Sequence, residues 1–261
     1  MDGGGVFELA LAWWPDVEHT LRRLLVVPVG SLEQHGPHLP LDTDTKIAVA
    51  VARRACAGRA GVALAPAFRV GASGEHADFP GTLSIGTEAL TACLVELGRH
   101  ASLHWPAMML VNGHGGNAAA VQAAAGRLRY EGRPVVAWHA GLPESDAHAG
   151  RFETSVMLAL DPGAVRLAEA EPGEARPLGQ IMPALRERGV RAVSGNGVLG
   201  DPAGASAAEG ERLLARLTQR LNDAMDRLLG RPDEQDGPAE QDGPAEQDRQ
   251  AGPDRQAGPA G

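Results

Sequence analysis

The sequence predicts an α/β protein in which helices cover both faces of a mostly parallel sheet, giving three α/β/α layers. Short apolar runs alternate along the chain with longer amphipathic stretches, a pattern typical of strand–helix–strand units. Two motifs rich in polar residues also begin directly where a predicted strand ends. Because ligands of open α/β sheets bind beyond the carboxyl ends of the strands, this placement indicates a functional site.

Four apolar runs are predicted to form strands, over residues 24–29, 62–65, 107–111 and 134–138. Their length and apolar character are those of strands buried on both faces. Helices are expected between and after them, over residues 45–57, 87–104, 117–131, 151–160 and 209–229. We expect Thr87 to cap the second of these helices, which follows a long glycine-rich loop over residues 71–86.

The composition changes sharply near residue 230. Residues 231–261 repeat short units such as EQDGPA and RQAGP and contain almost no large apolar side chains. Such a segment buries too little surface to offset the entropy of ordering it. We therefore expect one folded domain over residues 1–230 and a disordered, low-complexity acidic tail over residues 231–261. Of the formal charge of -9, the tail carries -5, from eight acidic residues and three arginines.

Charge and hydropathy exclude several classes of protein. The part before the tail is mildly acidic, whereas nucleic-acid binding selects basic surfaces. The chain has neither an apolar run near the roughly 20 residues of a membrane span nor a secretory signal, so we expect a cytoplasmic protein without membrane contact. Its two cysteines, Cys56 and Cys93, lie outside any Cys/His metal motif and are expected to be reduced thiols.

The first polar motif, GSLEQHGPHLPLDTDT, contains several candidate metal ligands in a short loop. Glu33 and His35 alternate, so at an extended strand end their side chains point the same way. Carboxylates and imidazoles together suit zinc, iron or manganese. A salt bridge within the loop is the alternative for these two residues. Asp44 is a further candidate ligand, for which the alternative is an N-cap or first-turn carboxylate of the next helix.

The second and third motifs each place a histidine beyond a predicted strand. In NGHGGN, three glycines flank His114, and glycines let backbone approach a ligand closely. We therefore expect His114 to be a ligand, with the neighbouring asparagines orienting the turn. In DAHAGRFETS, His148 and Glu153 precede or open a helix. For Glu153, a first-turn acid that complements the helix dipole is an equal alternative.

The motifs GSLEQHGPHLPLDTDT, FPGT, NGHGGN and HAGRFETS, in this order, resemble those of the creatininase family over residues 24–229. The resemblance implies a doubly wound α/β domain, hydrolysis of C–N amide bonds and a centre of two divalent metal ions. It also implies a homo-oligomer such as a hexamer built as a trimer of dimers. Residue by residue, Glu33 and His114 would hold one ion, His35 the other, and Asp44 would bridge the pair.

The chain departs from creatininase itself at two places. Creatininase has a metal-binding glutamate at the position of Gly116, and the resemblance leaves Glu153 as the candidate that completes the second ion here. The segment before His148 also lacks the tryptophan that helps creatininase to enclose its small cyclic substrate. Both departures argue against creatinine as the substrate.

A narrower resemblance concerns the substrate. GPHLPLDTDT, GASGEH, SIGTEALT, DAHAGRFETS and GVLGDP are similar to the peptidases of this family that act in mycofactocin biosynthesis. It implies that a modified precursor peptide is cleaved to release its C-terminal valine–tyrosine-derived fragment. The expected catalytic residues are Glu153, through the second ion, and His148, as the proton carrier to the leaving amine. Glu75 and His76 would contact the peptide or lie at the surface.

Two other functions compete with this interpretation. A hydrolase of the same family could act on a small cyclic amide or a formamide. The other alternative is a non-catalytic peptide carrier, whose degenerate site would be expected to have lost some of its ligands. We expect deletion of residues 231–261 to leave catalysis unchanged.

Overall fold

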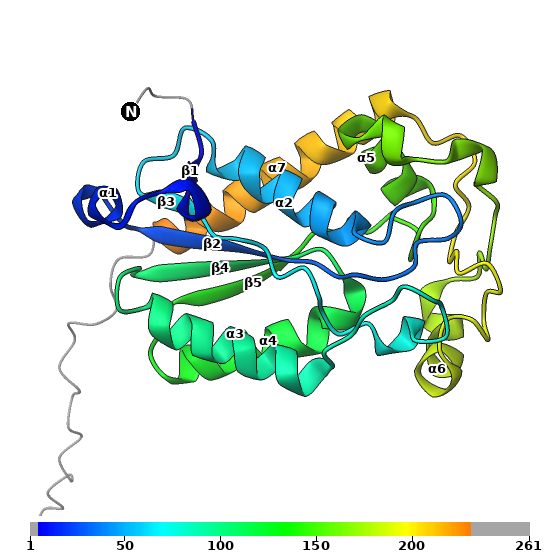
Figure 1. Cartoon of the computed structure of the whole chain (residues 1–261), viewed down its shortest axis with the longest axis horizontal. Coiled ribbons are helices and arrows are strands. Elements are labelled where there is room, and N and C mark those ends of the chain that lie inside the picture. Colours follow the sequence, from blue (N-terminus) through cyan, green and yellow to red (C-terminus); the bar gives the residue numbers. More distant parts are fainter. Residues whose placement is uncertain (1–4, 231–261) are drawn as a thin grey trace, which may run out of the picture. The chain divides into compact units, whose positions relative to one another are not determined.

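The computed structural model describes residues 5–230, and the tail expected over residues 231–261 lies outside the described residues (Figure 1). The described residues form a five-stranded sheet in the order β1-β3-β2-β4-β5, and all of its strand pairs are parallel. This sheet confirms the predicted fold class. The strands are β1 (Phe7–Glu8), β2 (Leu24–Val29), β3 (Val62–Leu64), β4 (Ala107–Asn112) and β5 (Val135–His139).

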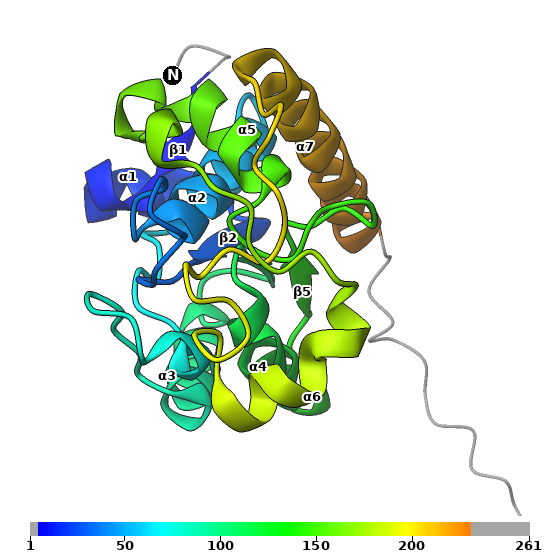
Figure 2. The same ribbon diagram turned by 90° about the vertical axis from the view of Figure 1, so that its right-hand side faces the viewer.

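Helices cover both faces of the sheet (Figures 1 and 2). One face is covered by α3 (Thr87–Ala101) and α4 (Ala118–Tyr130), and the other by α2 (Thr43–Cys56), α5 (Arg151–Leu160) and α7 (Ala207–Leu229). Alternate residues of β2 accordingly enter different cores: Leu24 and Val26 pack in one, Leu25 and Val27 in the other. Coverage on both faces explains why β2 and β4 are buried along their whole length.

The structure also contains elements that the sequence pattern did not predict. These are the two-residue strand β1, the helices α1 (Trp14–His19) and α6 (Leu178–Arg188), and the 3-10 turns η1 (Leu9–Leu11), η2 (Gly74–His76), η3 (Gly115–Asn117), η4 (Pro162–Ala164) and η5 (Leu167–Glu169). Helix α6 contains Pro183, a residue that usually marks a helix end. Within residues 5–230, no helix is both long and apolar enough to cross a membrane.

The predicted cap of α3 is wrong. Thr87 is the first residue of the helix, and Gly86 holds the capping position with a φ of +78°. Glycine adopts this left-handed conformation without steric cost, so the chain turns into the helix one residue earlier than expected. In the described part of the chain, the cap of α3 makes no side-chain hydrogen bond.

The order of the strands places a topological switch point between β2 and β4. After β2 the chain crosses to β3 on one side, and it returns to β4 on the other side of β2. The last residues of the two strands, Val29 and Asn112, are paired in register. The loops that follow β2 and β4 therefore begin side by side, in the crevice where α/β proteins bind ligands.

We predict opposite effects of two glycine-to-alanine substitutions in helices. A Cβ at Gly210 of α7 would overlap the backbone carbonyl of Ser155 in α5, so Gly210→Ala should lower the free energy of unfolding by about 1–3 kcal/mol. A Cβ at Gly126 of α4 would meet no heavy atom of the described residues within 4 Å. Gly126→Ala should therefore raise the free energy of unfolding by about 0.5–1 kcal/mol. Urea unfolding of both variants measures this contrast, and equal effects would contradict the close helix contact.

Candidate metal centre

The side chains of Glu33, His35, Asp44 and His114 converge in one buried cluster. Glu33 and His35 lie in the loop after β2, Asp44 in the first turn of α2, and His114 directly after β4. Their exposed fractions are between 0 and 4%. The switch point thus brings together residues of the first two polar motifs that the sequence singled out.

Asp44 lies between the two imidazoles. Its Oδ1 is 3.1 Å from His35 Nε2, and its Oδ2 is 3.2 Å from His114 Nδ1. The Ser31 hydroxyl also donates a hydrogen bond of 2.7 Å to Oδ2. Burial raises the pKa of Asp44, but the neighbouring His35 and His114 outweigh burial and hold that pKa well below its usual value. Asp44 is therefore an ionised carboxylate with one oxygen facing each imidazole. It does not cap α2, but it does lie in the first turn of that helix, as the alternative has it.

Glu33 is fully buried, and neither of its oxygens accepts a well-aligned hydrogen bond from the described residues. Ring nitrogens nevertheless lie close: His114 Nε2 is 3.0 Å from Oε2, and His76 Nε2 is 3.3 Å from Oε1. A buried carboxylate without full hydrogen bonding is costly unless a cation compensates it. The Glu33 carboxylate is thus suited to bind a metal ion.

His35 presents one nitrogen to the cluster. Its Nδ1 lies 3.1 Å from the Glu33 backbone carbonyl, to which it donates, so that Nε2 is the nitrogen that faces the cluster. Metal-binding histidines are commonly oriented in this way. Burial lowers the pKa of His35, but the carboxylates of Asp44 and Glu153 outweigh burial and raise it to about 10. The cluster therefore attracts positive charge strongly.

His148 and Glu153 approach the cluster from the segment after β5. His148 pairs with Leu199 through backbone hydrogen bonds of 3.2 and 2.9 Å. The side-chain Nε2 of His148 donates to the backbone carbonyl of Gln34 at 2.8 Å. Its Nδ1 then faces Glu33 Oε1 at 3.8 Å. Burial, together with the charges of neighbouring histidines, holds the pKa of His148 well below its usual value. This imidazole is neutral.

Glu153 lies on the His35 side of the cluster. Its Oε2 is 3.9 Å from His35 Nε2 and accepts a hydrogen bond of 2.6 Å from the Ala149 N–H. Ala149 has a φ of +53°, a strained conformation for a residue with a Cβ, and such strain is concentrated at functional sites. Burial raises the pKa of Glu153 to about 7. Glu153 is thus an acid of the first turn of α5, as the alternative has it, and its carboxylate also faces the cluster.

The glycine-rich loop after β3 lies closer to the buried cluster than the sequence pattern indicated. His76 is 3% exposed, so the alternative of a surface position is wrong for this residue. The Gln34 amide donates to His76 Nδ1 at 2.8 Å, which leaves Nε2–H directed at Glu33 Oε1. Glu75 is about one-third exposed, and its Oε1 is 3.4 Å from His114 Nε2. The sequence signals were a polar GEH triplet in a loop without periodicity and the resemblance carried by the motif GASGEH.

Within residues 5–230, three overlapping groups of side chains place their donor atoms within 4.8 Å of one another, as a metal site requires. The groups are Glu33 with His35 and Asp44, Glu33 with His76 and His148, and His35 with His148 and Glu153. Residues of the loops after β2, β3 and β5 all contribute to them. The donor set of carboxylates and imidazoles fits a borderline divalent ion.

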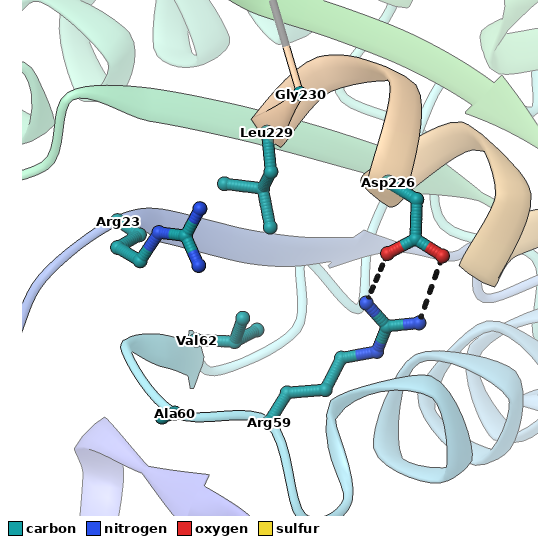
Figure 3. Close-up of a pocket in the computed structure, with 7 residues that line it drawn as sticks. All are labelled: Arg23, Arg59, Ala60, Val62, Asp226, Leu229 and Gly230. Atoms are coloured by element: carbon teal, nitrogen blue, oxygen red, sulfur yellow. Dashed lines mark hydrogen bonds and ion pairs between the residues drawn. The ribbon is translucent and has the colours of Figure 1, made fainter.

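A separate pocket lies at the opposite end of the strands (Figure 3). Its lining comes from the amino ends of β2 and β3 and the end of α7, and consists of Arg23, Arg59, Ala60, Val62, Asp226, Leu229 and Gly230. Arg59 forms an ion pair of 2.6 Å with Asp226 across it. Because it shares no residue with the buried cluster and lies away from the switch point, we do not regard it as the catalytic site.

A sequence model of the creatininase family, described as creatinine amidohydrolase, matches residues 10–225. The chain belongs to the creatininase family. It is accordingly a hydrolase of C–N bonds, and the predicted family and reaction class are confirmed.

Known proteins resemble this chain in sequence and in structure. A mycofactocin precursor peptide peptidase of Mycolicibacterium smegmatis is 51% identical over 215 residues, which are 80% of this chain and 87% of that protein. A creatinine amidohydrolase of Pseudomonas putida is 30% identical over 234 residues, which are 77% of this chain and 88% of that protein. A mutant creatininase structure described as Zn-Zn type has a TM-score of 0.71 at 27% identity, covering 85% of this chain and 98% of that one.

We predict that Asp44→Asn abolishes the stabilisation of this creatininase-family protein by divalent ions. An ion that binds only the folded state raises the free energy of unfolding by about 2.7 kcal/mol at a free concentration of 100 Kd. The matched control is Asp42→Asn, two residues away, because the Asp42 carboxylate is 35% exposed and pairs with Lys46. Thermal unfolding with and without zinc or manganese should show stabilisation by the ion in the wild type and in Asp42→Asn, and none in Asp44→Asn. An undiminished increment in Asp44→Asn would contradict the placement of the site.

Proposed function

We propose that this chain is a metal-dependent peptidase that cleaves the modified mycofactocin precursor peptide and releases its C-terminal valine–tyrosine-derived fragment. The observation that carries the proposal is the high identity, 45–51% over at least 80% of the chain, to proteins named mycofactocin precursor peptide peptidase. The buried cluster of carboxylates and imidazoles supports it, because it offers the donor atoms that a metal-dependent hydrolase needs.

We propose two divalent ions, zinc, iron or manganese, at this cluster. Glu33 and His114 would hold one, and His35 and Glu153 the other. Asp44 would contribute to both, since its two oxygens face His35 and His114 separately. The similar creatininase structure described as Zn-Zn type supports a pair of ions.

Bound divalent ions would supply Lewis acidity toward the scissile carbonyl and lower the pKa of water. Proton transfer would depend on the side chains of the protein itself. The tautomer of His148 is set by the bond from Nε2 to the Gln34 carbonyl, which leaves Nδ1 as the atom that takes up a proton. Because Nδ1 faces the Glu33 carboxylate at 3.8 Å, it lies at the cluster and would deliver the proton to the leaving amine.

His76 has a positioning role in this proposal. Its Nε2–H faces Glu33 Oε1, and its Nδ1 accepts from the Gln34 amide, whose nitrogen also donates to the Gly197 carbonyl at 3.1 Å. This close contact of 3.3 Å would help to orient Glu33 as a ligating carboxylate. It directs the other oxygen of Glu33 toward His114.

We further propose that the protein forms a homo-oligomer, with a hexamer as the expected size. The resemblance to creatininase supports this assembly. So do the large apolar side chains exposed near the start of the described chain, Leu11, Trp13 and Trp14, of which 72–75% is exposed in a single copy. Light scattering should give the mass of several copies, and the mass of one copy would contradict assembly.

The peptide assay tests the proposed function directly. The protein should release the C-terminal fragment from the modified precursor peptide, as detected by mass spectrometry. Removal of metal with a chelator should abolish release, and zinc, iron or manganese should restore it. Turnover of creatinine or a formamide without peptide cleavage would contradict the substrate, and full activity after metal removal would contradict the metal mechanism.

Variants of His148 separate proton transfer from metal binding in the same assay. His148→Asn should lower kcat about 10²–10⁴-fold, the range for loss of a general acid–base group, while the metal content stays unchanged. His100→Asn, an exposed position on α3, is the control and should retain wild-type activity. Loss of metal in His148→Asn would instead make this residue a ligand.

A further inference from the structure

Asn117 ends the η3 turn and directly precedes α4, a position where asparagine usually caps the helix. Within residues 5–230 its side chain makes no such capping bond, and it is fully buried. The amide faces other loops instead. Its nitrogen donates to the Gly30 carbonyl at 2.9 Å and to Asn112 Oδ1 at 3.2 Å. Its oxygen accepts from the Ala72 N–H at 2.7 Å.

These partners fix the orientation of the Asn117 amide. The Ala72 N–H can only donate and the Gly30 carbonyl can only accept, so the amide oxygen must face the first and the amide nitrogen the second. Both amide hydrogens are used. A side chain of similar size without these donors could fill the space but could not replace the bonds. The buried amide is therefore suited to hold its partners at fixed distances.

Two of the partners belong to different loops that contribute to the buried cluster. Gly30 opens the loop after β2, which carries Glu33 and His35. Ala72 lies in the glycine-rich loop after β3, which carries His76. One side chain thus joins these two loops to the start of α4.

The Asn117 amide also acts on His114, from two directions. Asn112 Oδ1 accepts from the His114 N–H at 3.2 Å, and Asn112 Nδ2 donates to the His114 carbonyl at 2.6 Å. The Ala72 peptide unit, whose N–H is bound by Asn117, turns its carbonyl toward His114 Nε2 at 3.1 Å. The backbone of His114 is thus held through Asn112, and its ring through Ala72.

The backbones around the Asn117 amide approach one another closely. A Cβ at Gly71 would lie 2.4 Å from Asn117 Oδ1 and 2.7 Å from the Gly30 carbonyl. A Cβ at Gly30 would in turn overlap Thr45, which follows Asp44 in the first turn of α2. Because interiors packed this closely transmit strain, a displacement of the amide would reach the loops and the start of α2.

We propose that Asn117 is a positioning residue of the metal centre, whose amide sets the relative placement of the loops after β2, β3 and β4. This inference rests on the proposed metal-dependent function. Asn117 acts through backbone groups and through Asn112, so its effect on an ion is indirect. Loss of a residue that orients metal ligands typically costs about 10–100-fold in metal affinity or activity.

The test compares Asn117→Asp and Gly71→Ala with Gln122→Glu. Aspartate keeps the shape of asparagine but replaces the donating nitrogen by an acceptor that faces the Gly30 carbonyl. Gly71→Ala places a methyl group against the same amide and leaves Asn117 itself unchanged. Gln122 is an exposed amide on α4, so Gln122→Glu makes the same chemical change away from the three loops.

Zinc affinity is measured by competition with a chromophoric chelator, and the metal environment by the visible absorption of the cobalt-substituted protein. The ring 15N chemical shifts of the buried histidines in the metal-free protein report their placement without an ion. We expect Asn117→Asp and Gly71→Ala to bind zinc about 10–100-fold more weakly, with altered cobalt spectra and ring shifts, and to lower kcat more than they raise KM. Gln122→Glu should match wild type in each measurement.

Wild-type zinc affinity, cobalt spectrum and ring shifts in either folded variant would overturn the positioning role, even if that variant unfolds at a lower temperature. Loss of the folded state in both variants would overturn it too, because Asn117 would then serve the fold as a whole. So would an equal loss of affinity in Gln122→Glu, which would assign the effect to a charge on α4. If the wild-type protein binds no divalent ion, the proposed function fails, and the ring shifts of the metal-free variants still decide whether Asn117 positions the cluster.

Discussion

Asp44 places one carboxylate oxygen 3.1 Å from His35 and the other 3.2 Å from His114, in a position that is 2% exposed. Three features make this burial tolerable. Asp44 lies in the first turn of α2, where the helix dipole favours negative charge, Ser31 donates a hydrogen bond to it, and the two imidazoles lower its pKa. Because His35 and His114 come from loops after different strands, this one side chain joins the two halves of the site.

The topology of the sheet makes that contact possible. Strands β2 and β4 end in register, so the loops that carry His35 and His114 start from adjacent positions. The loops after β3 and β5 then add Glu75 and His148 from either side. The candidate site is thus concentrated beyond the carboxyl ends of the strands, where ligands of open α/β sheets bind.

Much of this arrangement could be predicted from the sequence, because it depends on local patterns. The apolar runs locate β2 to β5 within one or two residues, and Glu33, His35, Asp44 and His114 stand out as polar groups directly after strands or at a helix start. The metal-binding roles of these residues and of Glu153 remain proposals. Glu75 and His76 could not be placed, because the η2 turn is held by Val190 far along the chain and no local periodicity reports such a contact. Helix α6 could not be predicted either, because Pro183 locally disfavours a helix interior. Here the packing of Ile181 and Leu185 in a small apolar cluster outweighs that local preference.

Crystallographic anomalous scattering from the protein loaded with zinc or manganese tests the central role of Asp44 most directly. The account predicts two peaks per chain, one on each side of the Asp44 carboxylate, with Oδ1 bound to the ion beside His35 and Oδ2 to the ion beside His114. A single peak, or two peaks that do not share Asp44, would contradict it.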